Sequence, residues 1–252
     1  MKISEIYETI NEFAPFSSQS EWDNSGLIIG SMNTDVKKAG FALDATPEVI
    51  NDAKKKGCQL IITHHPVIFN PVSSLSETDP AYLAIKNGIA VISVHTPFDK
   101  SEPGVNTVLA SLLGLKDIKI MDTDEEGLCH VGTLERPLSS KEFAQIIAKA
   151  LGGGVTYSAR SGRIKKVAVC GGAAGEFYEA ALASGAQAFV TGEAKHHHFL
   201  GARQANIALY AAGHYETEAP AMKVLKDIMQ KKTGIDCVML AQKKTTEFTG
   251  AI

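Results

Sequence analysis

The chain repeats itself, and this repeat restricts the possible folds more than any other feature of the sequence. Residues 42–65 align without a gap with residues 170–193. In both copies a strand enters a turn, a helix follows and ends at a glycine, and a short apolar strand ends at a threonine, Thr63 or Thr191. Short apolar runs without alternation are typical of parallel strands that are covered on both faces. The repeat therefore predicts two related α/β halves built from βαβ units.

The repeat continues through a third strand that ends in a histidine. Ile89–His95 matches Ala208–His214, and an acid follows four residues later in each copy, Asp99 or Glu218. If the chain turns helical there, positions i and i+4 share one face, and a histidine and a carboxylate could bind the same ion. For either copy alone, an acid that caps the next helix is an equally good explanation. The same spacing at equivalent strand ends in both halves favours a shared chemical role.

The boundary between the halves is predicted in the acidic, turn-rich stretch of residues 122–127. We therefore expect a first α/β half at residues 1–126 and a second at residues 127–252. Each half is predicted to be an α/β/α domain with a mixed sheet, and the pair to have arisen by internal duplication. Equivalent strand ends that face one another would place a binding site between the halves.

Local capping signals support the helices of this scheme. Thr46 is a predicted N-cap, with Pro47 at the first helical position. Ser139 and Glu142 form a predicted capping box ahead of a helix at residues 143–151. Helices are thus expected between the predicted strands of both halves.

The first chemical motif is Thr63-His64-His65-Pro66, at the carboxyl end of a buried strand. In open α/β sheets this edge is where ligands bind. Adjacent histidines in a regular strand point to opposite faces, but an irregular turn imposed by Pro66 can direct both imidazoles into one cleft. A single histidine here would be explained by a hydrogen bond at the strand terminus, whereas a pair favours a metal site.

The candidate ligands outnumber those of one metal ion. The set comprises His64, His65, His95, Asp99, His214 and Glu218. It exceeds one tetrahedral zinc and suits two divalent ions, which lie roughly 3.5–4 Å apart in two-metal hydrolytic sites. Mixed nitrogen and oxygen ligands leave zinc, iron, manganese and nickel open.

The second copy carries Thr191-Gly192-Glu193 where the first carries its histidine pair. Glu193 is a candidate general base or a partner that orients a metal ligand. A plain surface glutamate explains it equally well. His95, beside the candidate ligands, is a second candidate for moving protons.

Three further motifs leave alternatives open. The glycine-rich Cys170–Gly175 stretch follows a strand and suits an anion cradle, but a tight turn explains it equally well. The triplet His196–His198 fans around a helix, so it is expected to be mostly exposed, with one member lining the pocket. Trp22–Gly26 is a core anchor or a wall of the cleft.

Composition and cysteine usage exclude several classes of function. A net charge of -3 provides no basic surface for nucleic acid, and no apolar stretch is long enough to span a bilayer. The N-terminus suggests an amphipathic helix rather than a signal peptide. The four cysteines form no C-x-x-C motif, which argues against a zinc ribbon and fits a reducing compartment. We therefore expect a cytoplasmic protein without membrane or nucleic-acid partners.

Taken in order along the chain, these motifs resemble those of the NIF-three-like dinuclear-metal proteins, often catalogued as GTP cyclohydrolase type-two homologues. The matching blocks are Glu21–Leu27, Thr63–Pro66, Ser93–Thr96, Thr191–Glu193 and Gly213–Glu218. The resemblance implies metal ligands at His64, His65, Asp99, His214 and Glu218, with His95 close by. It also implies two similar α/β domains, a ring-shaped homohexamer, and the short form of the family, without the domain that longer relatives insert between the halves.

The resulting hypothesis is a dinuclear-metal-dependent hydrolase that acts on a purine nucleotide, in the manner of a GTP cyclohydrolase. A metal-bound hydroxide would attack C8 of GTP and open the imidazole ring, while Glu193 or His95 moves protons. One alternative is a two-metal phosphoesterase, although the sequence has neither the D-x-H…G-N-H series nor the D-H-H motif of such enzymes. Another is a non-enzymatic metal-binding or regulatory protein.

Overall fold

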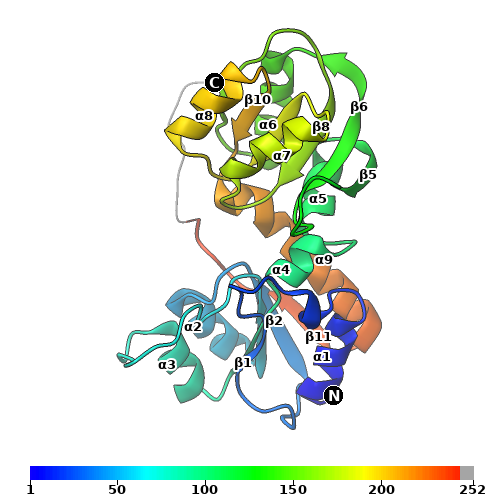
Figure 1. Cartoon of the computed structure of the whole chain (residues 1–252). Coiled ribbons are helices and arrows are strands. Elements are labelled where there is room, and N and C mark those ends of the chain that lie inside the picture. The colour runs from blue at the N-terminus through cyan, green and yellow to red at the C-terminus, as the bar shows by residue number, and fades with distance from the viewer. Residues whose placement is uncertain (245–252) are drawn as a thin grey trace. The chain divides into compact units, whose positions relative to one another are not determined.

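The computed structural model of the chain describes residues 1–244 and has a mixed α/β fold with two sheets (Figure 1). The predicted fold class, α/β with two mixed sheets, is confirmed. The last part of the predicted second half, residues 245–252, lies outside the described residues. Of the helices in the described part of the chain, none is long and apolar enough to cross a membrane.

The chain divides into two compact units whose limits differ from those of the predicted halves. The first unit contains residues 1–103 and 221–243, and the second is centred on residues 104–220. The expected boundary after residue 126 lies inside the second unit, because strand β5 (Lys116–Ile120) pairs with the strand that follows it. The C-terminal strand, in turn, returns to the sheet of the first unit.

The first unit contains a five-stranded sheet in the order β1-β4-β3-β2-β11. Its strands are β1 (Gly26–Ile29), β2 (Lys38–Ala42), β3 (Leu60–Thr63), β4 (Ala90–Ser93) and β11 (Asp236–Met239). Strand β1 runs antiparallel to β4, and all other neighbours are parallel. Every residue of β3 and β4 is buried, as expected for unalternating apolar strands that are covered on both faces.

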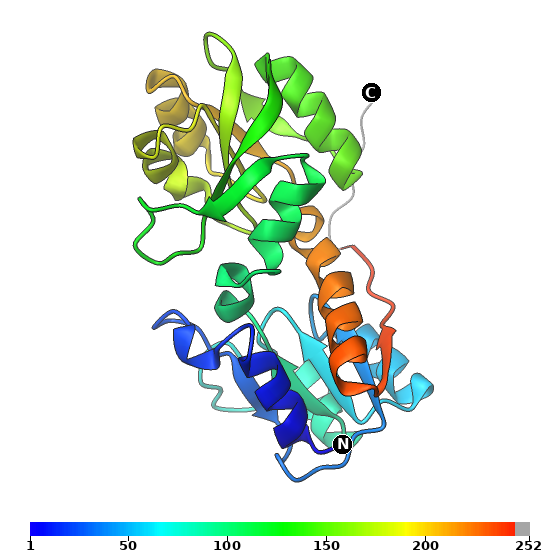
Figure 2. The same ribbon diagram turned by 90° about the vertical axis from the view of Figure 1, so that its right-hand side faces the viewer.

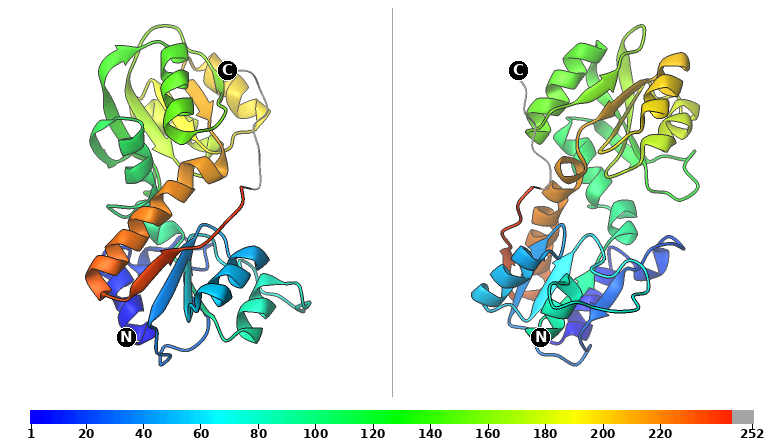
Figure 3. Two further views of the ribbon diagram at one scale, coloured as in Figure 1. Left: turned by 180° about the vertical axis from the view of Figure 1, so that it is seen from behind. Right: turned by 90° about the vertical axis from the view of Figure 1, so that its left-hand side faces the viewer.

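Helices cover both faces of this sheet (Figures 2 and 3). They are α1 (Ile3–Asn11), α2 (Pro47–Lys56), α3 (Pro80–Lys86) and the later turns of α9 (His214–Thr233). The unit also contains a 3-10 turn at Phe16–Ser18 and the short helix α4 (Thr96–Lys100), which follows β4. The predicted ends of α2 are confirmed, since the Thr46 hydroxyl accepts the N–H of Val49 and Gly57 ends the helix with a φ of 71°. Ile50, Ile61 and Val91 belong to one buried cluster of this unit.

The second unit contains a six-stranded sheet in the order β5-β6-β8-β9-β10-β7. The strands after β5 are β6 (His130–Leu138), β7 (Thr156–Ser158), β8 (Ile164–Cys170), β9 (Ala188–Thr191) and β10 (Ala208–Ala211). Strands β8, β9 and β10 are parallel, and β5, β6 and β7 run antiparallel to their neighbours. The sheet is therefore mixed, as predicted.

Two core layers sandwich this second sheet. Its helices are α5 (Val105–Leu112), α6 (Ser140–Leu151), a 3-10 turn at Gly175–Phe177, α7 (Tyr178–Ala183) and α8 (His196–Gln204). Leu109 and Phe143, from α5 and α6, belong to one buried layer, and Ala181 and Ala202, from α7 and α8, belong to the other. The predicted capping box of α6 is present, with Ser139 N–H bonded to Glu142 Oε2 at 2.7 Å and Glu142 N–H to Ser139 Oγ at 3.3 Å.

The predicted repeat is visible in the strand connections of the two units. In each, three parallel strands follow one another along the chain, β2-β3-β4 and β8-β9-β10, and an antiparallel strand borders the third. The registers also correspond, since Thr63 pairs with Ser93 and Thr191 pairs with Ala211. The two cores therefore place the carboxyl ends of equivalent strands in equivalent positions.

Candidate metal centre

The histidine pair of the first unit sits in an irregular turn after β3. The backbone N–H groups of His64 and His65 both donate to the carbonyl of Leu43, at 3.2 and 3.0 Å. The Thr63 hydroxyl donates to the carbonyl of His65 at 2.8 Å. The chain thus leaves strand geometry, and the two imidazoles lie beside one another with ring centroids 5.1 Å apart. The irregular turn that the sequence predicted after Thr63 is present.

His95 and Asp99 join this pair. The ring centroid of His95 lies 5.0 Å from that of His64 and 5.6 Å from that of His65. One ligand atom from each of the three histidines lies within 4.8 Å of the others. Asp99 Oδ1 lies 3.5 Å from His64 Nε2. The first unit therefore gathers four of the candidate residues into one cluster, with His64 fully buried.

All three imidazoles of the cluster have Nδ1 against a hydrogen-bond acceptor. The acceptors are Val94 O for His64 at 3.0 Å, Asp44 Oδ1 for His65 at 2.7 Å, and Asp23 Oδ1 for His95 at 2.9 Å. An Nδ1–H that donates to such an acceptor leaves the lone pair on Nε2 available for a metal. The donor set and its tautomers therefore fit a divalent metal ion.

Asp23 contacts the candidate site, although the sequence did not single it out within the Trp22–Gly26 motif. Its side chain is fully buried and accepts hydrogen bonds from His95 Nδ1, from the N–H and hydroxyl of Thr96, and from the Ser25 hydroxyl. Burial alone would raise the pKa of Asp23, but the hydrogen bonds from His95, Thr96 and Ser25 outweigh it and hold this pKa well below its usual range. The available signal was the Trp22–Gly26 motif, which contains this acid.

Asp44 is a second missed residue, and the C-terminal segment holds it in place. The side-chain amide of Gln242 donates to Asp44 Oδ2, and its oxygen accepts the N–H groups of Leu43 at 2.9 Å and Asp44 at 3.1 Å. Asp44 and Gln242 are 198 residues apart in sequence. No spacing rule connects such residues, so the sequence carried no signal for this support.

The second unit gathers His214, Glu218 and Glu193. His214 is the first residue of α9, and its Nε2 lies 3.1 Å from Oε2 of Glu218, one helical turn later. Its Nδ1 lies 2.8 Å from Glu193 Oε1. Glu193 therefore contacts His214, and its role as an orienting partner or a general base stays a prediction. Its side chain is 60% exposed, whereas that of Glu218 is 5% exposed.

The glycine-rich turn after β8 does not form an anion cradle. The N–H groups of Gly171, Gly172 and Ala174 donate to Asn106 Oδ1 at 2.7 Å, Thr217 Oγ1 at 3.2 Å and Thr191 Oγ1 at 3.2 Å. These donors are committed to protein acceptors and cannot also hold an anion. Of the two interpretations that the sequence left open, the structure supports the tight turn.

Gly172 gives this turn its role at the site. Its φ is +67°, and a Cβ there would clash with Glu218 Oε1 and lie 3.3 Å from His214 Nε2. Only glycine adopts this conformation readily and leaves that space empty. The turn therefore provides room for the carboxylate and the imidazole that face it.

His95 and His214 are not equivalent in the strand register. Val94 and Ala212 make the same backbone hydrogen bond, each to the carbonyl of the threonine that ends the preceding strand in the sheet. His214 therefore lies one residue further along its copy than His95 does. His95 precedes helix α4, whereas His214 begins α9. The Asp99 N–H donates to the carbonyl of His95 at 3.2 Å, so in both copies the acid lies one helical turn after its histidine, although the two histidines differ by one residue in strand register.

The histidine triplet of α8 is divided between solvent and a small cavity. His196 and His197 are exposed, and His198 is buried. Burial and the neighbouring His197 lower the pKa of His198. His198 and Glu193 both line a cavity of about 240 Å³, with Lys195 and Glu176 at its walls. One member of the triplet therefore shares a pocket with a candidate catalytic residue.

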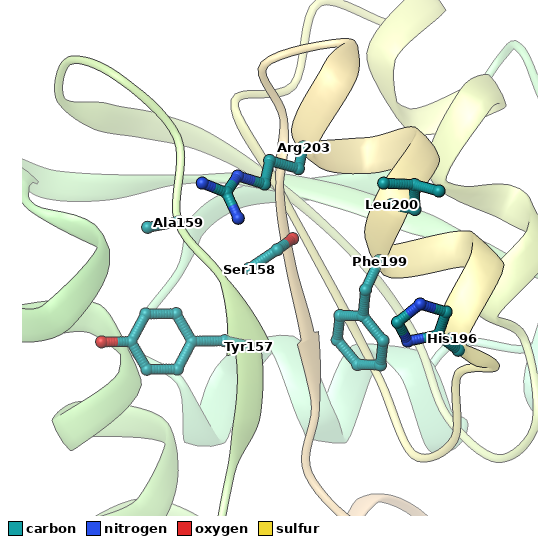
Figure 4. A pocket seen from close by; sticks show the side chains of 7 residues that line it. All are labelled: Tyr157, Ser158, Ala159, His196, Phe199, Leu200 and Arg203. Carbon is teal, nitrogen blue, oxygen red and sulfur yellow. The ribbon is translucent and has the colours of Figure 1, made fainter.

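A larger cavity, of about 450 Å³, lies between β7 and α8 (Figure 4). It is lined by Tyr157, Ser158, His196, Phe199, Leu200 and Arg203. None of the candidate metal ligands lines it. His196 therefore lines a pocket to which no candidate metal ligand contributes.

Comparison with known proteins identifies the family. The model of the Duf34/NIF3 (NGG1p interacting factor 3) family matches residues 1–246. A relative from Lactococcus lactis subsp. lactis is 32% identical over 98% of this chain and 99% of its own length, and one from Clostridium perfringens is 29% identical over 98% of each. Both are named GTP cyclohydrolase 1 type 2 homolog.

Solved structures of similar proteins agree with this assignment. The hypothetical protein SA1388 of Staphylococcus aureus has a TM-score of 0.91 and 25% identity, covering 100% of this chain and 99% of its own. Reduced HcgD of Methanocaldococcus jannaschii has a TM-score of 0.83 and 29% identity, covering 95% and 98%. The match of the family model over nearly the whole sequence confirms the predicted resemblance, and the chain belongs to the Duf34/NIF3 family.

Proposed function

We propose that this chain is a metal-dependent hydrolase that acts on a purine nucleotide. The observation that carries the proposal is the orientation of the histidines. His64, His65, His95 and His214 each have Nδ1 against an acceptor, and a carboxylate lies 3.5 Å or less from Nε2 of both His64 and His214. The names of the relatives, GTP cyclohydrolase 1 type 2 homolog, suggest the substrate class.

Two divalent ions of zinc, iron, manganese or nickel are proposed as the cofactors. His64, His65, Asp99, His214 and Glu218 would hold them, with His95 as a sixth ligand because its ring lies in the same cluster. Bound ions of this kind supply Lewis-acid activation of water and polarisation of the substrate. A single centre shared by the two halves stays a prediction from the duplicated sequence.

The residues around Glu193 suggest how protons would move. One carboxylate oxygen of Glu193 holds His214 in place, and the side chain is exposed enough to accept a proton from water or substrate. The adjacent cavity of about 240 Å³ carries Lys195, whose charge suits a phosphate group. The buried Asp23 holds His95 in position. We therefore assign His95 to metal binding rather than to proton transfer.

The test is hydrolysis of GTP by protein of known metal content. Protein stripped with a chelator is reloaded separately with zinc, manganese, iron(II) or nickel, and formate is measured after incubation with pure GTP. We expect formate only from metal-loaded protein. If every metal-loaded form leaves GTP, other nucleotides and simple phosphoesters intact, the hydrolase proposal fails and a metal-binding or regulatory role takes its place.

The homohexamer and the cytoplasmic location stay predictions. Multi-angle light scattering of the purified protein measures the mass in solution, and the expected value is six times that of the 26.9 kDa chain. A monomeric mass would contradict the predicted ring. Fractionation of cells that express the chain tests the location.

A further inference from the structure

Two large aromatic side chains are exposed beside the histidine cluster of the first unit. Trp22 is 51% exposed and Phe69 is 42% exposed. Their rings stack on one another, with centroids 6.0 Å apart and an interplanar angle of 28°. Exposed apolar surface of this kind is unfavourable in water and often marks a ligand-binding surface.

Both rings also contact the imidazole of His95. The Trp22 centroid lies 5.6 Å from that of His95 at an angle of 77°, and the Phe69 centroid lies 6.0 Å from it at 75°. His95 in turn lies against His64 and His65. The Trp22–Phe69 pair therefore forms a wall that begins at the edge of the candidate metal cluster and ends in solvent.

The polar residues next to this wall hold it in position. Trp22 precedes Asp23, whose carboxylate is fixed by His95, Thr96 and Ser25. The Asn24 side-chain amide donates to the carbonyl of Ile68 at 2.7 Å and so ties the loop of Phe69 to that of Trp22. The two aromatic rings are thus preorganised without being buried in the core, which lowers the entropic cost of binding a ligand there.

We infer that the Trp22–Phe69 pair binds the planar heteroaromatic ring of the substrate by stacking. This inference rests on the proposed function, which places the reaction at the metal cluster. It adds the two residues that would select a substrate with an aromatic ring. Aromatic faces bind nucleobases by stacking with little dependence on the identity of the base. A ring stacked on this wall lies next to His95, so the wall presents the ring to the metal cluster.

Tryptophan fluorescence tests the inference directly, because Trp22 is the single tryptophan of the chain. Metal-loaded protein is titrated with guanosine monophosphate and, separately, with ribose 5-phosphate, which has the sugar phosphate but no ring. We expect saturable quenching by the first and none by the second. Equal responses to the two ligands would overturn the inference.

A matched pair of variants separates stacking from general effects on the loop. Phe69→Ala should weaken the binding of guanosine monophosphate roughly 5- to 100-fold, the range for the loss of one stacking partner. Val72→Ala removes a side chain that is 53% exposed on the same loop and should leave the affinity unchanged. Trp22→Ala, measured by equilibrium dialysis, should weaken binding at least as much as Phe69→Ala.

The outcomes distinguish this inference from the proposed hydrolase. Quenching by the nucleotide without any formate would support ring binding while the hydrolase proposal fails. Formate production with no quenching, and with the same KM in Phe69→Ala, would overturn ring binding while the hydrolase stands. A change of mass in solution for Trp22→Ala, with unchanged nucleotide affinity, would also overturn it and assign the wall to contacts between copies of the chain.

Discussion

The two α/β cores share a framework but differ in how they carry chemistry at the ends of their strands. In both, three parallel strands are bordered by an antiparallel strand, with corresponding registers. The first core gathers three histidines and an aspartate, and the second gathers one histidine and two glutamates. The sheets thus repeat closely, while the side chains at their edges have diverged.

The position two residues after the first parallel strand of each core shows the difference most clearly. After β2 it is Asp44, whose carboxylate holds His65. After β8 it is Gly172, which leaves the space that Glu218 and His214 face. A carboxylate supports a candidate ligand, His65, in one copy, and the absence of a side chain leaves room for the candidate ligands His214 and Glu218 in the other. The same backbone position therefore contributes a side chain to the first cluster and leaves space for side chains in the second.

Burial distinguishes the two clusters as well. The His64 side chain is fully buried, whereas that of His214 is 34% exposed. The orienting acid of His95 is fully buried, whereas that of His214 is 60% exposed. The first cluster therefore contains the more deeply buried imidazole and orienting acid, and the second contains the more solvent-exposed ones.

The largest expected effect is that of His64→Ala compared with His214→Ala. Removal of the buried imidazole leaves a cavity and its acceptor unsatisfied, so we expect a loss of about 2–4 kcal/mol in the free energy of unfolding together with loss of bound metal. His214→Ala should also lose metal but cost only about 1 kcal/mol in the free energy of unfolding, because its imidazole is 34% exposed. His197→Ala, an exposed histidine outside the cluster, should change stability by less than about 0.5 kcal/mol. Elemental analysis and urea unfolding measure both quantities, and equal costs for the first two would contradict the comparison.

A pair of glycine variants measures the space that Gly172 provides. Gly152 has nearly the same φ, +69°, but no atom within 4 Å of an added Cβ. Gly152→Ala should therefore cost about 1–2 kcal/mol from the left-handed conformation alone. Gly172→Ala should cost about 1–3 kcal/mol more because it displaces the Glu218 carboxylate, and it should weaken metal binding. If the two variants lose the same stability and bind metal alike, Gly172 has only a conformational role.

The orienting acids should differ in their effect on metal affinity. Asp23→Asn removes a buried charge that holds His95, and we expect a loss of roughly 10- to 100-fold in affinity. Glu193→Gln should cost less than about 10-fold, because its carboxylate is mostly exposed and solvent screens it. Competition with a metal chelator measures both, with Asp122→Asn, an acid that is 83% exposed, as the control. A larger loss of metal affinity in Glu193→Gln than in Asp23→Asn would contradict this comparison.

The smallest expected effect concerns the edge of the first sheet where β11 pairs with β2 in parallel. In the second sheet the corresponding neighbour of β8 is the antiparallel strand β6. Asp52 accepts hydrogen bonds from the N–H of Ala241 and from the Lys56 ammonium. Both lower the pKa of Asp52, and the bond from Ala241 has the larger effect. A carboxylate with a lowered folded-state pKa stabilises the fold above the unfolded value of about 4, and this contribution is lost as the pH falls through the folded-state pKa. Asp52→Asn should therefore flatten the acid side of the profile of stability against pH. If the profile of Asp52→Asn below about pH 6 is the same as that of the unchanged protein, this prediction is contradicted.

Much of the fold was predictable because its signals are local. The caps of α2 and α6, the apolar strands β3 and β9, and the histidine pair after Thr63 each depend on residues a few positions apart. The unit limits were not predictable in the same way. Strand β11 pairs with β2 across almost the whole chain, and no periodicity indicates such a partner.

The sequence by itself determined the repeat, the strand ends at which chemistry occurs, and the residue types that suit a metal. The tertiary structure alone decided which acceptor holds each imidazole. Those acceptors lie 21, 30 and 72 residues away from their histidines in the first cluster, and Gln242 supports Asp44 from 198 residues away. Hydrogen bonds between such distant residues depend on how the strands are ordered in the sheet and on how the chain returns to it. A linear pattern of residue types can mark candidate ligands, but only the folded chain determines how their side chains are oriented.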